Sequence, residues 1–597
     1  MTVAAAPPSA VFGVERSVTG KSWRLRPADD RHAAALAQDH GLADIVARVL
    51  CARGVLSEGC AEFLAPTLRT ALPDPSHLKD MDEAARRIVA AVTAGETIAV
   101  FGDYDVDGAT SAALLARFFA ALGRSVPVYI PDRQAEGYGP NIAALRKLKA
   151  EGAALAITVD CGTTAWEPLE QAVAEGLEII VIDHHVAEPR LPAGCLVVNP
   201  NRVDETSPHG QLAAVGVAFL LVVAVNRLLR ESYWYGEGHA EPDLMSWLDL
   251  VALGTVCDVV PLRGVNRALV AQGLKVMARR ANAGIAALAE VARIDRRLDA
   301  YHAGFILGPR VNAGGRVGDA GLGVRLLATD DAAEARYVAE RLDACNRERQ
   351  AIERIVLDAA MEQAEAQARA GAPLILAAGA GWHPGVIGIV AGRLRERFDL
   401  PSCVIALAGG IGRGSGRSVP GVALGPAVIA AHQAGHLVNG GGHEMAAGFT
   451  VEEGRIEALR DFLGERIARQ LGGAAPQPHL SLDAALAPGG ATVALLEALE
   501  RIGPFGAGNP RPRFALPEAR IVMADVVGED HVRCIVAGGD GASRLKAICF
   551  RAAGAPLGAA LLGARGASLH LAGTLRLDEW QGRREPQLFI DDAARLS

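Results

Sequence analysis

Residues 97–122 of the chain read TIAVFGDYDVDGATSAALLARFFAAL. The segment 97–101 is a short apolar run, which predicts a buried strand. An acidic loop bounded by glycines follows it, and residues 110–122 then repeat apolar side chains at helical spacing. A strand, a loop and a helix in this order form the repeating unit of a parallel α/β sheet.

The same pattern continues along the chain. Segments of helical character alternate with short apolar runs that predict strands, at residues 126–130, 155–159, 178–182 and 196–198. Nearly continuous apolar strands suit a sheet that is covered on both faces. We therefore expect an α/β domain with a doubly wound parallel sheet. The most apolar segment, residues 213–225, is too short to span a membrane and predicts a buried helix.

The 597 residues are enough for several domains. A charged, proline-free segment predicts one long linking helix, or two, and a second, smaller α/β unit follows it. Glycine-rich loops are expected at residues 409–421 and 440–443, and short β-like runs near the end predict a small β-barrel. The predicted divisions are a disordered N-terminus at 1–20, a helical lead-in at 21–76, the first α/β domain at 77–329, the linking helix at 330–371, the second α/β domain at 372–472 and the barrel at 475–597.

The chain carries a net charge of −8, which argues against a protein that coats nucleic acid through a global basic field but is compatible with a local basic groove. Its nine cysteines are scattered and form no Cys-x-x-Cys pair, so we expect neither a disulfide framework nor a zinc ribbon. The first ten residues lack the pattern of a signal peptide. These features predict a cytoplasmic protein with no membrane segment.

The acidic loop places Asp103, Asp105 and Asp107 at alternate positions. Three carboxylates packed together repel one another unless a cation lies between them, and Mg²⁺ or Mn²⁺ prefers such oxygen ligands. The loop is therefore a candidate metal site. A solvated acidic loop or a single calcium site explains the same three residues equally well.

Three further clusters carry acids or histidines. Asp160 ends one predicted strand, where an aspartate also commonly caps a following helix. Asp183, His184 and His185 end another strand. A histidine there can bind metal while a carboxylate orients its ring, or it can simply lie on the surface. Asp258 lies within an apolar segment and needs a partner, for which an ordinary hydrogen bond would suffice.

The combination of the four clusters is more informative than any one of them. Three clusters follow predicted strands, and the carboxyl ends of parallel strands share the edge of the sheet where sites form. This edge would bring Asp105, Asp107, Asp160 and His184 together, with Asp258 arriving from a later segment. Two divalent ions about 4 Å apart could share a carboxylate there, activate water and stabilise the leaving oxygen of a phosphodiester. The sequence therefore predicts a metal-dependent phosphoesterase.

The motif Asp183-His184-His185, together with the other clusters in this order, resembles the DHH phosphoesterase superfamily. The second α/β domain resembles the superfamily's substrate-binding DHHA1 domain, in its motifs Arg413-x-Ser415-x-Arg417 and Gly440-Gly441-Gly442-His443. Three more motifs are similar to the RecJ family of single-strand-specific exonucleases, and they read LGPRVN at 307–312, GWHPG at 381–385 and FGAGNP at 505–510. The resemblance runs from about residue 50 to the end and implies a C-terminal OB-fold barrel.

The resemblance implies a pair of divalent metal ions, Mn²⁺ or Mg²⁺. Asp105 and Asp160 would hold one ion. Asp107, Asp160, His184 and Asp258 would hold the other, so that Asp160 bridges the two.

The same resemblance assigns His185 to the scissile phosphate and Asp183 to the orientation of a histidine. The chain departs from the superfamily pattern at one position, because many members place a metal-binding histidine four residues before the first of the two loop aspartates. Phe101 stands at that position and cannot bind metal, so Asp103 is the candidate substitute.

Phosphate contacts are implied outside the acidic clusters. Arg133 and Arg310 would grip a terminal 5′ phosphate, since a guanidinium can hold a phosphate through two hydrogen bonds. Either arginine could instead form a surface salt bridge, and for Arg133 taken alone that interpretation is favoured. Glycine-rich loops let backbone N–H groups approach phosphate closely. In the second α/β domain the implied contacts are Ser415, Arg417, Gly441 and, near the scissile group, His443.

The barrel would bind single strands through basic and aromatic side chains. The candidates are Phe505, Arg511, Arg513, Arg576, Trp580, Arg583 and Arg584. The resemblance implies 5′→3′ hydrolysis of single-stranded DNA to 5′-mononucleotides in DNA repair and recombination, by a monomer that acts with a single-strand-binding protein and a helicase. The alternatives are hydrolysis of small nucleotides or oligoribonucleotides, and a non-catalytic scaffold. The barrel and the retained acidic residues favour the exonuclease.

Overall fold

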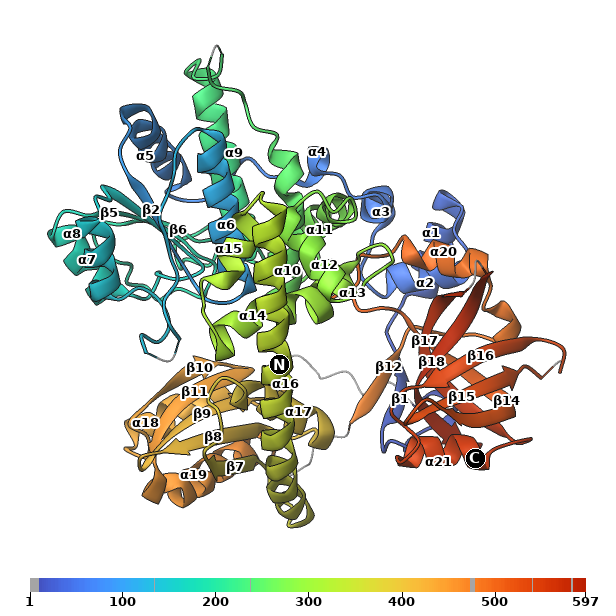
Figure 1. Ribbon diagram of the computed structural model, residues 1–597. Coiled ribbons are helices and arrows are strands. Elements are labelled where there is room, and N and C mark those ends of the chain that lie inside the picture. The colour runs from blue at the N-terminus through green and yellow to red at the C-terminus, as the bar shows by residue number, and fades with distance from the viewer. Residues whose placement is uncertain are drawn as a thin grey trace.

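The computed structural model describes residues 10–133, 135–236, 238–472, 478–539, 541–580 and 583–596. Figure 1 shows two α/β domains, one above the other, joined by a single long helix, with a β-barrel beside them. None of the helices in these ranges is both long enough and apolar enough to cross a bilayer.

A five-stranded parallel sheet forms the centre of the first α/β domain, in the order β3-β2-β4-β5-β6. The strands are β2 (Ile98–Gly102), β3 (Val128–Tyr129), β4 (Leu155–Val159), β5 (Glu178–Ile182) and β6 (Leu196–Val198). Apolar helices cover both faces, which confirms the doubly wound sheet. One face packs against α5 (Met81–Ala94), α6 (Val106–Ala121) and α9 (Ala214–Glu231), and the other against α7 (Ile142–Ala150) and α8 (Trp166–Ala174).

A helical layer completes this domain. It contains α10 (Leu248–Cys257), α11 (Gly264–Met277), α12 (Ala283–Val291), α13 (Ala300–His302), the π-helical turn η4 (Ala303–Leu307), α14 (Gly308–Val317) and α15 (Leu322–Ala328). Helix α10 packs closely on α6, because a Cβ at Gly254 would lie only 2.3 Å from Thr110 Oγ1 and 3.0 Å from Asp107 Oδ1. This close approach brings the C-terminal end of α10 to the carboxyl edge of the sheet.

The linking segment is one continuous helix, α16 (Ala332–Arg369), which leads into a five-stranded sheet of order β10-β11-β9-β8-β7. The strands are β7 (Ile375–Ala380), β8 (Ser402–Ala408), β9 (Ile411–Arg417), β10 (Asn439–His443) and β11 (Ala446–Glu452), and the helices are α17 (Ile387–Phe398), α18 (Leu424–Gln433) and α19 (Ile456–Gln470). The prediction of glycine-rich loops was wrong for β9 and β10. A Cβ at Gly414 would lie 2.1 Å from the Phe449 ring, so these glycines make room for a neighbouring strand's side chain.

The C-terminal barrel is a six-stranded sheet of order β13-β14-β15-β16-β18-β17, and an additional pairing of β14 with β17 closes it. The strands are β13 (Ala484–Ala485), β14 (Arg513–Val527), β15 (His531–Ala537), β16 (Arg544–Cys549), β17 (Ser568–Trp580) and β18 (Arg583–Arg595), with helices α20 (Val493–Glu500) and α21 (Pro556–Gly563). The barrel agrees with the OB-fold that the sequence resemblance implies.

The N-terminal segment joins the barrel. Strand β1 (Ser22–Leu25) pairs in parallel with β12 (His479–Leu482), and Trp23 Nε1 donates a hydrogen bond of 2.9 Å to buried Asp592. The helices of the lead-in, α1 (Asp30–His40), α2 (Asp44–Cys51), α3 (Ser57–Leu64) and α4 (Leu68–Ala71), follow it.

Disorder was predicted for residues 1–20, of which 1–9 lie outside the described residues. Residues 10–20 pack against the barrel instead of standing free of it. The Phe12 ring stacks on His570 at 5.4 Å, and Val18 N donates to Ala593 O at 2.8 Å. The domain boundaries drawn from the sequence stay a prediction.

Candidate metal centre and phosphate cleft

The carboxyl ends of β2, β4 and β5 meet at one edge of the sheet, where Asp258 joins them from the end of α10. Asp103, Asp107 and Asp160 are buried there. The potential ligand atoms form three overlapping groups, each within 4.8 Å, namely Asp103–Asp105–Asp160, Asp107–His184–Asp258 and Asp160–His184–His185.

Two helix N-termini hold the loop aspartates in place. Asp105 caps α6, and its carboxylate accepts hydrogen bonds from the backbone of Asp107 at 2.8 Å and of Gly108 at 3.1 Å. Asp107 accepts from Ala214 N at 2.7 Å and from Val215 N at 2.9 Å, where α9 begins. Free N–H groups at a helix start favour negative charge, so the backbone fixes both carboxylates.

Asp160 lies in a tight turn directly after β4. Its φ of +61° is in the left-handed region, which aspartate tolerates better than most residues. The turn closes at Gly162, where φ is +118° and a Cβ would lie 2.7 Å from Thr158 Oγ1. The Tyr138 hydroxyl donates to the Asp160 carbonyl at 3.0 Å. This backbone arrangement fixes the position of the Asp160 side chain.

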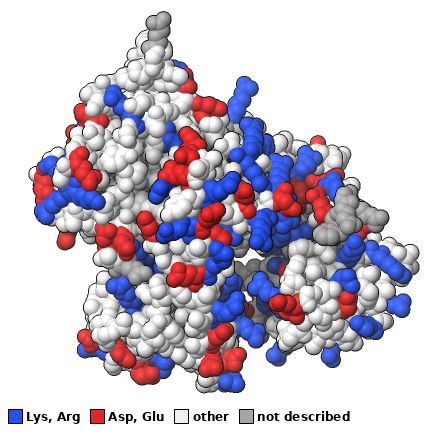
Figure 2. Space-filling model, in the orientation of Figure 1, with Lys and Arg blue, Asp and Glu red and all other residues white. Residues whose placement is uncertain are grey.

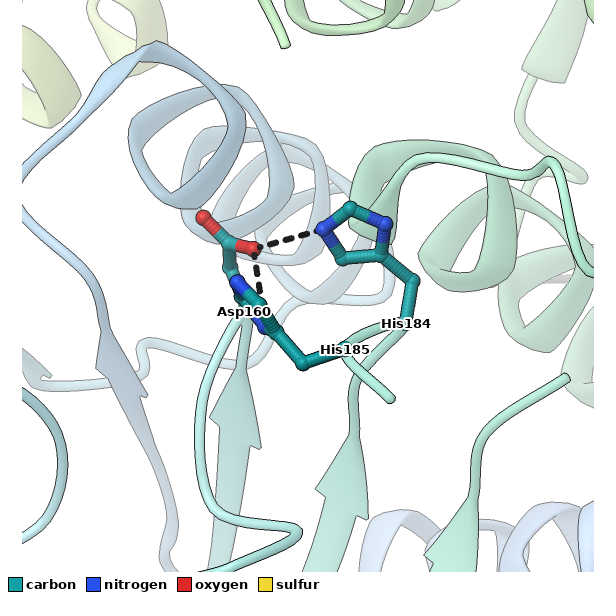
Figure 3. Close-up of side chains that lie close together, drawn as sticks. All are labelled: Asp160, His184 and His185. Carbon is teal, nitrogen blue, oxygen red and sulfur yellow. Dashed lines mark ion pairs between the residues drawn. The ribbon is translucent and has the colours of Figure 1, made fainter. Parts of the chain in front are cut away.

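Figure 3 shows both imidazoles of the His184–His185 pair facing one carboxylate oxygen of Asp160. His184 Nε2 lies 3.3 Å from Asp160 Oδ1, 3.6 Å from Asp258 Oδ2 and 3.8 Å from Asp107 Oδ2. His185 Nδ1 lies 4.0 Å from the same Asp160 oxygen. One oxygen of Asp160 thus faces both histidines, and the Asp160 carboxylate also belongs to the group with Asp103 and Asp105.

Asp183 organises the two histidines without facing the other acids. Its Oδ1 accepts from His184 N at 2.7 Å and from His185 N at 3.2 Å, and it lies 2.7 Å from His185 Nδ1. Its Oδ2 accepts from Thr163 N at 3.1 Å. Burial opposes the ionised form, yet these hydrogen bonds and the His185 charge hold the pKa of Asp183 well below its usual value.

Two asparagines that the sequence analysis missed support the same turn. Asn199 Nδ2 donates to His185 O at 2.9 Å, and Asn201 Nδ2 donates to His184 O at 2.5 Å. Both follow β6 in the sequence Asn199-Pro200-Asn201. Their only signal in the sequence is their place after a strand of the same sheet.

Burial and mutual repulsion raise the pKa values of several acids in the cluster. Burial, and next to it the charge of Asp105, raises the pKa of Asp107 to about 7. Burial and Asp107 raise the pKa of Asp258 to about 9, and the pKa of Asp160 is also raised well above its usual value. Burial lowers the pKa of His184 to about 4, which leaves its imidazole neutral and able to bind a metal ion.

Several buried polar atoms in the cluster have no hydrogen-bond partner in the part of the chain that the structure describes. They are Asp103 Oδ1, His184 Nε2 and Asp258 Oδ2. Buried polar atoms are almost always paired, so this concentration of unpaired oxygen and nitrogen atoms needs an explanation. Oxygen and imidazole ligands suit Mg²⁺ and Mn²⁺, and the residues present therefore fit a divalent-ion centre.

A cleft of about 570 Å³ separates the two α/β domains beside this centre, and its lining includes Arg133, Arg316, Ser415, Arg417 and Gly441. The Arg133 guanidinium lies 5.0 Å from the ring centroid of Tyr104, which stands between two of the loop acids. The cleft therefore opens next to the acidic centre and presents cationic side chains from both domains.

Comparisons with known proteins agree with this arrangement. Residues 97–255 match the profile of the DHH family N-terminal domain, residues 371–469 match the DHHA1 domain, and residues 482–592 match the RecJ OB domain. The chain is 36% identical over 562 residues to the single-stranded-DNA-specific exonuclease RecJ of Escherichia coli, covering 92% of this chain and 96% of the relative. The chain belongs to the RecJ family.

Solved RecJ structures extend the agreement to the fold. The RecJ of Thermus thermophilus in complex with Mn²⁺ matches with a TM-score of 0.79 and 31% identity, over 96% of this chain and 79% of that chain. The same protein in complex with Mg²⁺ matches with a TM-score of 0.73 and 30% identity, over 96% and 78%. The predicted domain order of the RecJ family is confirmed.

The phosphate contacts inferred from RecJ resemblance are only partly brought together. Arg133, Ser415, Arg417 and Gly441 line the cleft. Arg310 does not, because its Nε donates to Asp343 Oδ1 at 3.0 Å.

His443, also inferred from the RecJ family, lies exposed at the end of β10 and is not part of the cleft lining. Arg316, which the sequence analysis missed, lines the cleft, and its Nη1 donates to Gly385 O at 2.9 Å. Burial and the nearby Arg133 lower the pKa of Arg316 to about 10. Its sequence signal, one arginine after two glycines, is weak.

Proposed function

We propose that the chain is a metal-dependent exonuclease that hydrolyses single-stranded DNA from its 5′ end to 5′-mononucleotides. This proposal rests on two neighbouring sites, each of which has an excess of one sign of charge. An acidic centre with unpaired buried ligand atoms lies directly beside a cleft lined by arginines. A divalent-ion pair and a phosphodiester would complete the two sites together.

The proposed ligands follow the geometric groups. Asp105 and Asp160 hold one ion, and Asp103 stands in for the histidine that Phe101 replaces, since its carboxylate lies within the same group. Asp107, His184 and Asp258 would hold the second ion, and Asp160 would contribute to both.

When bound, a pair of divalent ions activates water as a nucleophile and stabilises the leaving oxygen of a phosphodiester. The side chains of this chain orient the substrate for that reaction. Although burial opposes its charge, the hydrogen bond with Asp183 raises the pKa of His185 to about 9 in the metal-free protein, and we propose that this imidazole holds the scissile phosphate. Asp183 is the positioning residue that aligns its ring.

The cleft supplies the contacts proposed for recognition of the strand end. Arg133, Arg316 and Arg417 would contact phosphates, with Arg133 gripping the 5′ phosphate. The cleft of about 570 Å³ lies within the ~300–1,000 Å³ range of pockets that hold a small ligand, so it can accommodate the terminal part of a strand. We propose Arg310 as a further phosphate contact only if its guanidinium leaves Asp343 on binding.

The family also suggests where and with what the enzyme acts. We propose that it works as a monomer in the cytoplasm, on strands that a helicase and a single-strand-binding protein expose during DNA repair and recombination. Co-purification of a single-strand-binding protein with the tagged chain, resistant to nuclease treatment, is the outcome expected of this proposal.

The direct test is digestion of a 3′-labelled single strand bearing a 5′ phosphate, beside its blunt duplex, with Mn²⁺, Mg²⁺ or EDTA. We expect metal-dependent shortening of the single strand from its 5′ end and no attack on the duplex. The variant Asp160→Ala should bind the strand and leave it intact. Absence of cleavage under both metals would overturn the proposal, and hydrolysis of dinucleotides alone would indicate a small-nucleotide phosphodiesterase.

A further inference from the structure

Two exposed aromatic rings stack on each other in the helical layer of the first domain. Tyr301 on α13 and Phe305 in η4 are 46% and 73% exposed, and their ring centroids lie 5.2 Å apart at an angle of 26°. Aromatic side chains stabilise a fold mainly when they are removed from water. Packing therefore does not account for a tyrosine and a phenylalanine that remain in solvent.

This aromatic pair lies close to the acidic centre. The turn η4 packs on the last part of α10, since a Cβ at Gly304 would lie 3.1 Å from Val256 Cγ1 and one at Gly308 would lie 2.4 Å from Cys257 Sγ. The residue after Cys257 is Asp258. A π-helical turn of this kind frequently marks a functional site.

On its other side the pair meets the barrel. The Arg576 guanidinium of β17 lies 5.7 Å from the Tyr301 ring centroid and 4.8 Å from that of Phe589 on β18. Phe589 in turn meets Phe550, which is 48% exposed, at 5.1 Å. A continuous series of rings and one guanidinium thus leads from beside Asp258 to the surface of the barrel.

Arg576 differs from the other barrel arginines that the sequence singled out. The others with described side chains form ion pairs, namely Arg511 with Glu500, Arg513 with Asp591 and Arg584 with Glu497. Arg576 has no acidic partner within 4.0 Å among the described residues, and its Nε is buried without a hydrogen bond. The side chains of Trp580 and Arg583 lie outside the described part of the chain.

Cations gather next to the aromatic series. In Figure 2, Lys and Arg side chains collect where α11–α13 face the barrel. In the loop before α13, Arg293, Arg296 and Arg297 are exposed, and none has an ion pair within the described ranges. Asp295 is exposed among them, while Asp299 is engaged in capping α13. A positive local field therefore surrounds the rings, although the whole chain is acidic.

We propose that Tyr301, Phe305 and Arg576 form a stacking site for bases of single-stranded DNA that extends from the acidic centre to the barrel. The inference rests on the proposed function and names the path of the uncleaved strand. Aromatic rings stack on any base, while the adjacent arginines attract the phosphates, so the site binds without sequence preference. Each ring lost should weaken binding of a strand that reaches it roughly 10-fold.

The first experiment measures kcat/KM for single strands of increasing length, from a dinucleotide upward, with Tyr301→Ala, Phe305→Ala and the double variant. We expect no change on the shortest substrates and a loss of roughly 10-fold per ring beyond a threshold length. Tyr337→Ala is the matched control, because Tyr337 is 52% exposed on α16 and belongs to no part of the series. An equal loss at every length would indicate a disturbed Asp258 and would overturn the proposal.

The second experiment measures binding alone, by quenching of 2-aminopurine placed at successive positions of the strand. One stretch of positions should be quenched, Phe305→Ala should abolish that quenching, and Tyr301→Phe should retain it because the ring remains. Unchanged quenching in the double variant would overturn the stacking site. This binding readout separates the two proposals, because it gives its answer even if the wild-type chain hydrolyses no DNA.

Discussion

The acidic centre and the cleft beside it are built in opposite ways. The centre collects carboxylates from one domain and fixes them by strand ends and helix N-termini. The cleft is lined by arginines and glycines from two domains, and these residues lie close together only because the two domains pack against each other. In each, like charges oppose one another. The acids raise one another's pKa, whereas burial and Arg133 lower the pKa of Arg316 and Arg417.

This difference teaches that each site is electrostatically incomplete, because the acidic centre lacks cations and the arginine-lined cleft lacks anions. A buried group of like charges is costly unless counter-charges are present. Divalent cations would satisfy the first site and phosphates the second, so a phosphodiester bound to ions would relieve both. The predictions below test whether the two sites contribute separately, as chemistry and as binding.

The largest effect is expected for Asp160→Asn. The change keeps the size of the side chain but removes the charge that faces both histidines, so hydrolysis with Mn²⁺ or Mg²⁺ should be lost while the dissociation constant for single strands changes little. Single-turnover cleavage and fluorescence anisotropy measure the two quantities. Asp249→Asn is the matched control and should retain activity, because Asp249 is also buried but lies on α10, outside the acidic centre. Near-normal cleavage by Asp160→Asn would contradict the shared-ligand assignment.

An intermediate effect is expected in the cleft. Arg417→Ala should raise KM by roughly 10- to 100-fold with a smaller change in kcat, because one hydrogen bond to a charged group contributes about 1.5–3 kcal/mol. Arg310→Ala should change KM much less, since the Arg310 guanidinium is engaged with Asp343. Steady-state kinetics on strands with 5′-phosphate and 5′-hydroxyl ends measures both. Equal effects of the two variants would show that Arg310 moves to the substrate.

The smallest effect concerns stability against pH in the metal-free protein. His185 keeps its proton up to about pH 9, against an ordinary value of 6.5, and Asp258 keeps its proton up to about pH 9, against 3.8. The folded state therefore holds more protons than the unfolded state between pH 6.5 and about 9, and the free energy of unfolding should fall as pH rises through this window.

Urea denaturation in EDTA measures this slope, to which one such proton contributes up to about 1.4 kcal/mol per pH unit. Asp258→Asn should flatten it, and saturating Mn²⁺ should remove it, because ion binding favours the deprotonated ligands. A slope that neither change alters would place its origin outside the acidic centre.

The sequence predicted the acidic centre well because local patterns determine it. The runs at 155–159, 178–182 and 196–198 coincide with β4, β5 and β6, and each cluster acid follows a strand or the apolar helix α10. The rule that parallel strands end on one edge then suffices to bring the acids together. No long-range packing detail is needed for this step.

The cleft and the supporting contacts were less predictable, for a physical reason. Arg316, Asn199 and Asn201 act through partners 14 or more residues away in the sequence, and their neighbours give only a weak signal. The glycines of β9 and β10 conceal two strands, because glycine is rare in strands and removes the usual alternation of apolar and polar side chains. Arg310 was expected at the cleft, but the sequence does not reveal its competing partner Asp343.

The pairing of β1 with β12, and of Trp23 with Asp592, has a consequence for how the chain is made. Residues 22–25 are translated before both α/β domains, whereas their partners are translated after both of them. Domains generally fold as they emerge, N-terminal ones first. The first α/β domain therefore has its complete set of strands long before β1 finds a neighbour, and the N-terminal strand waits unpaired through most of translation. Assembly of the barrel is the step that finally joins segments from either side of the two α/β domains.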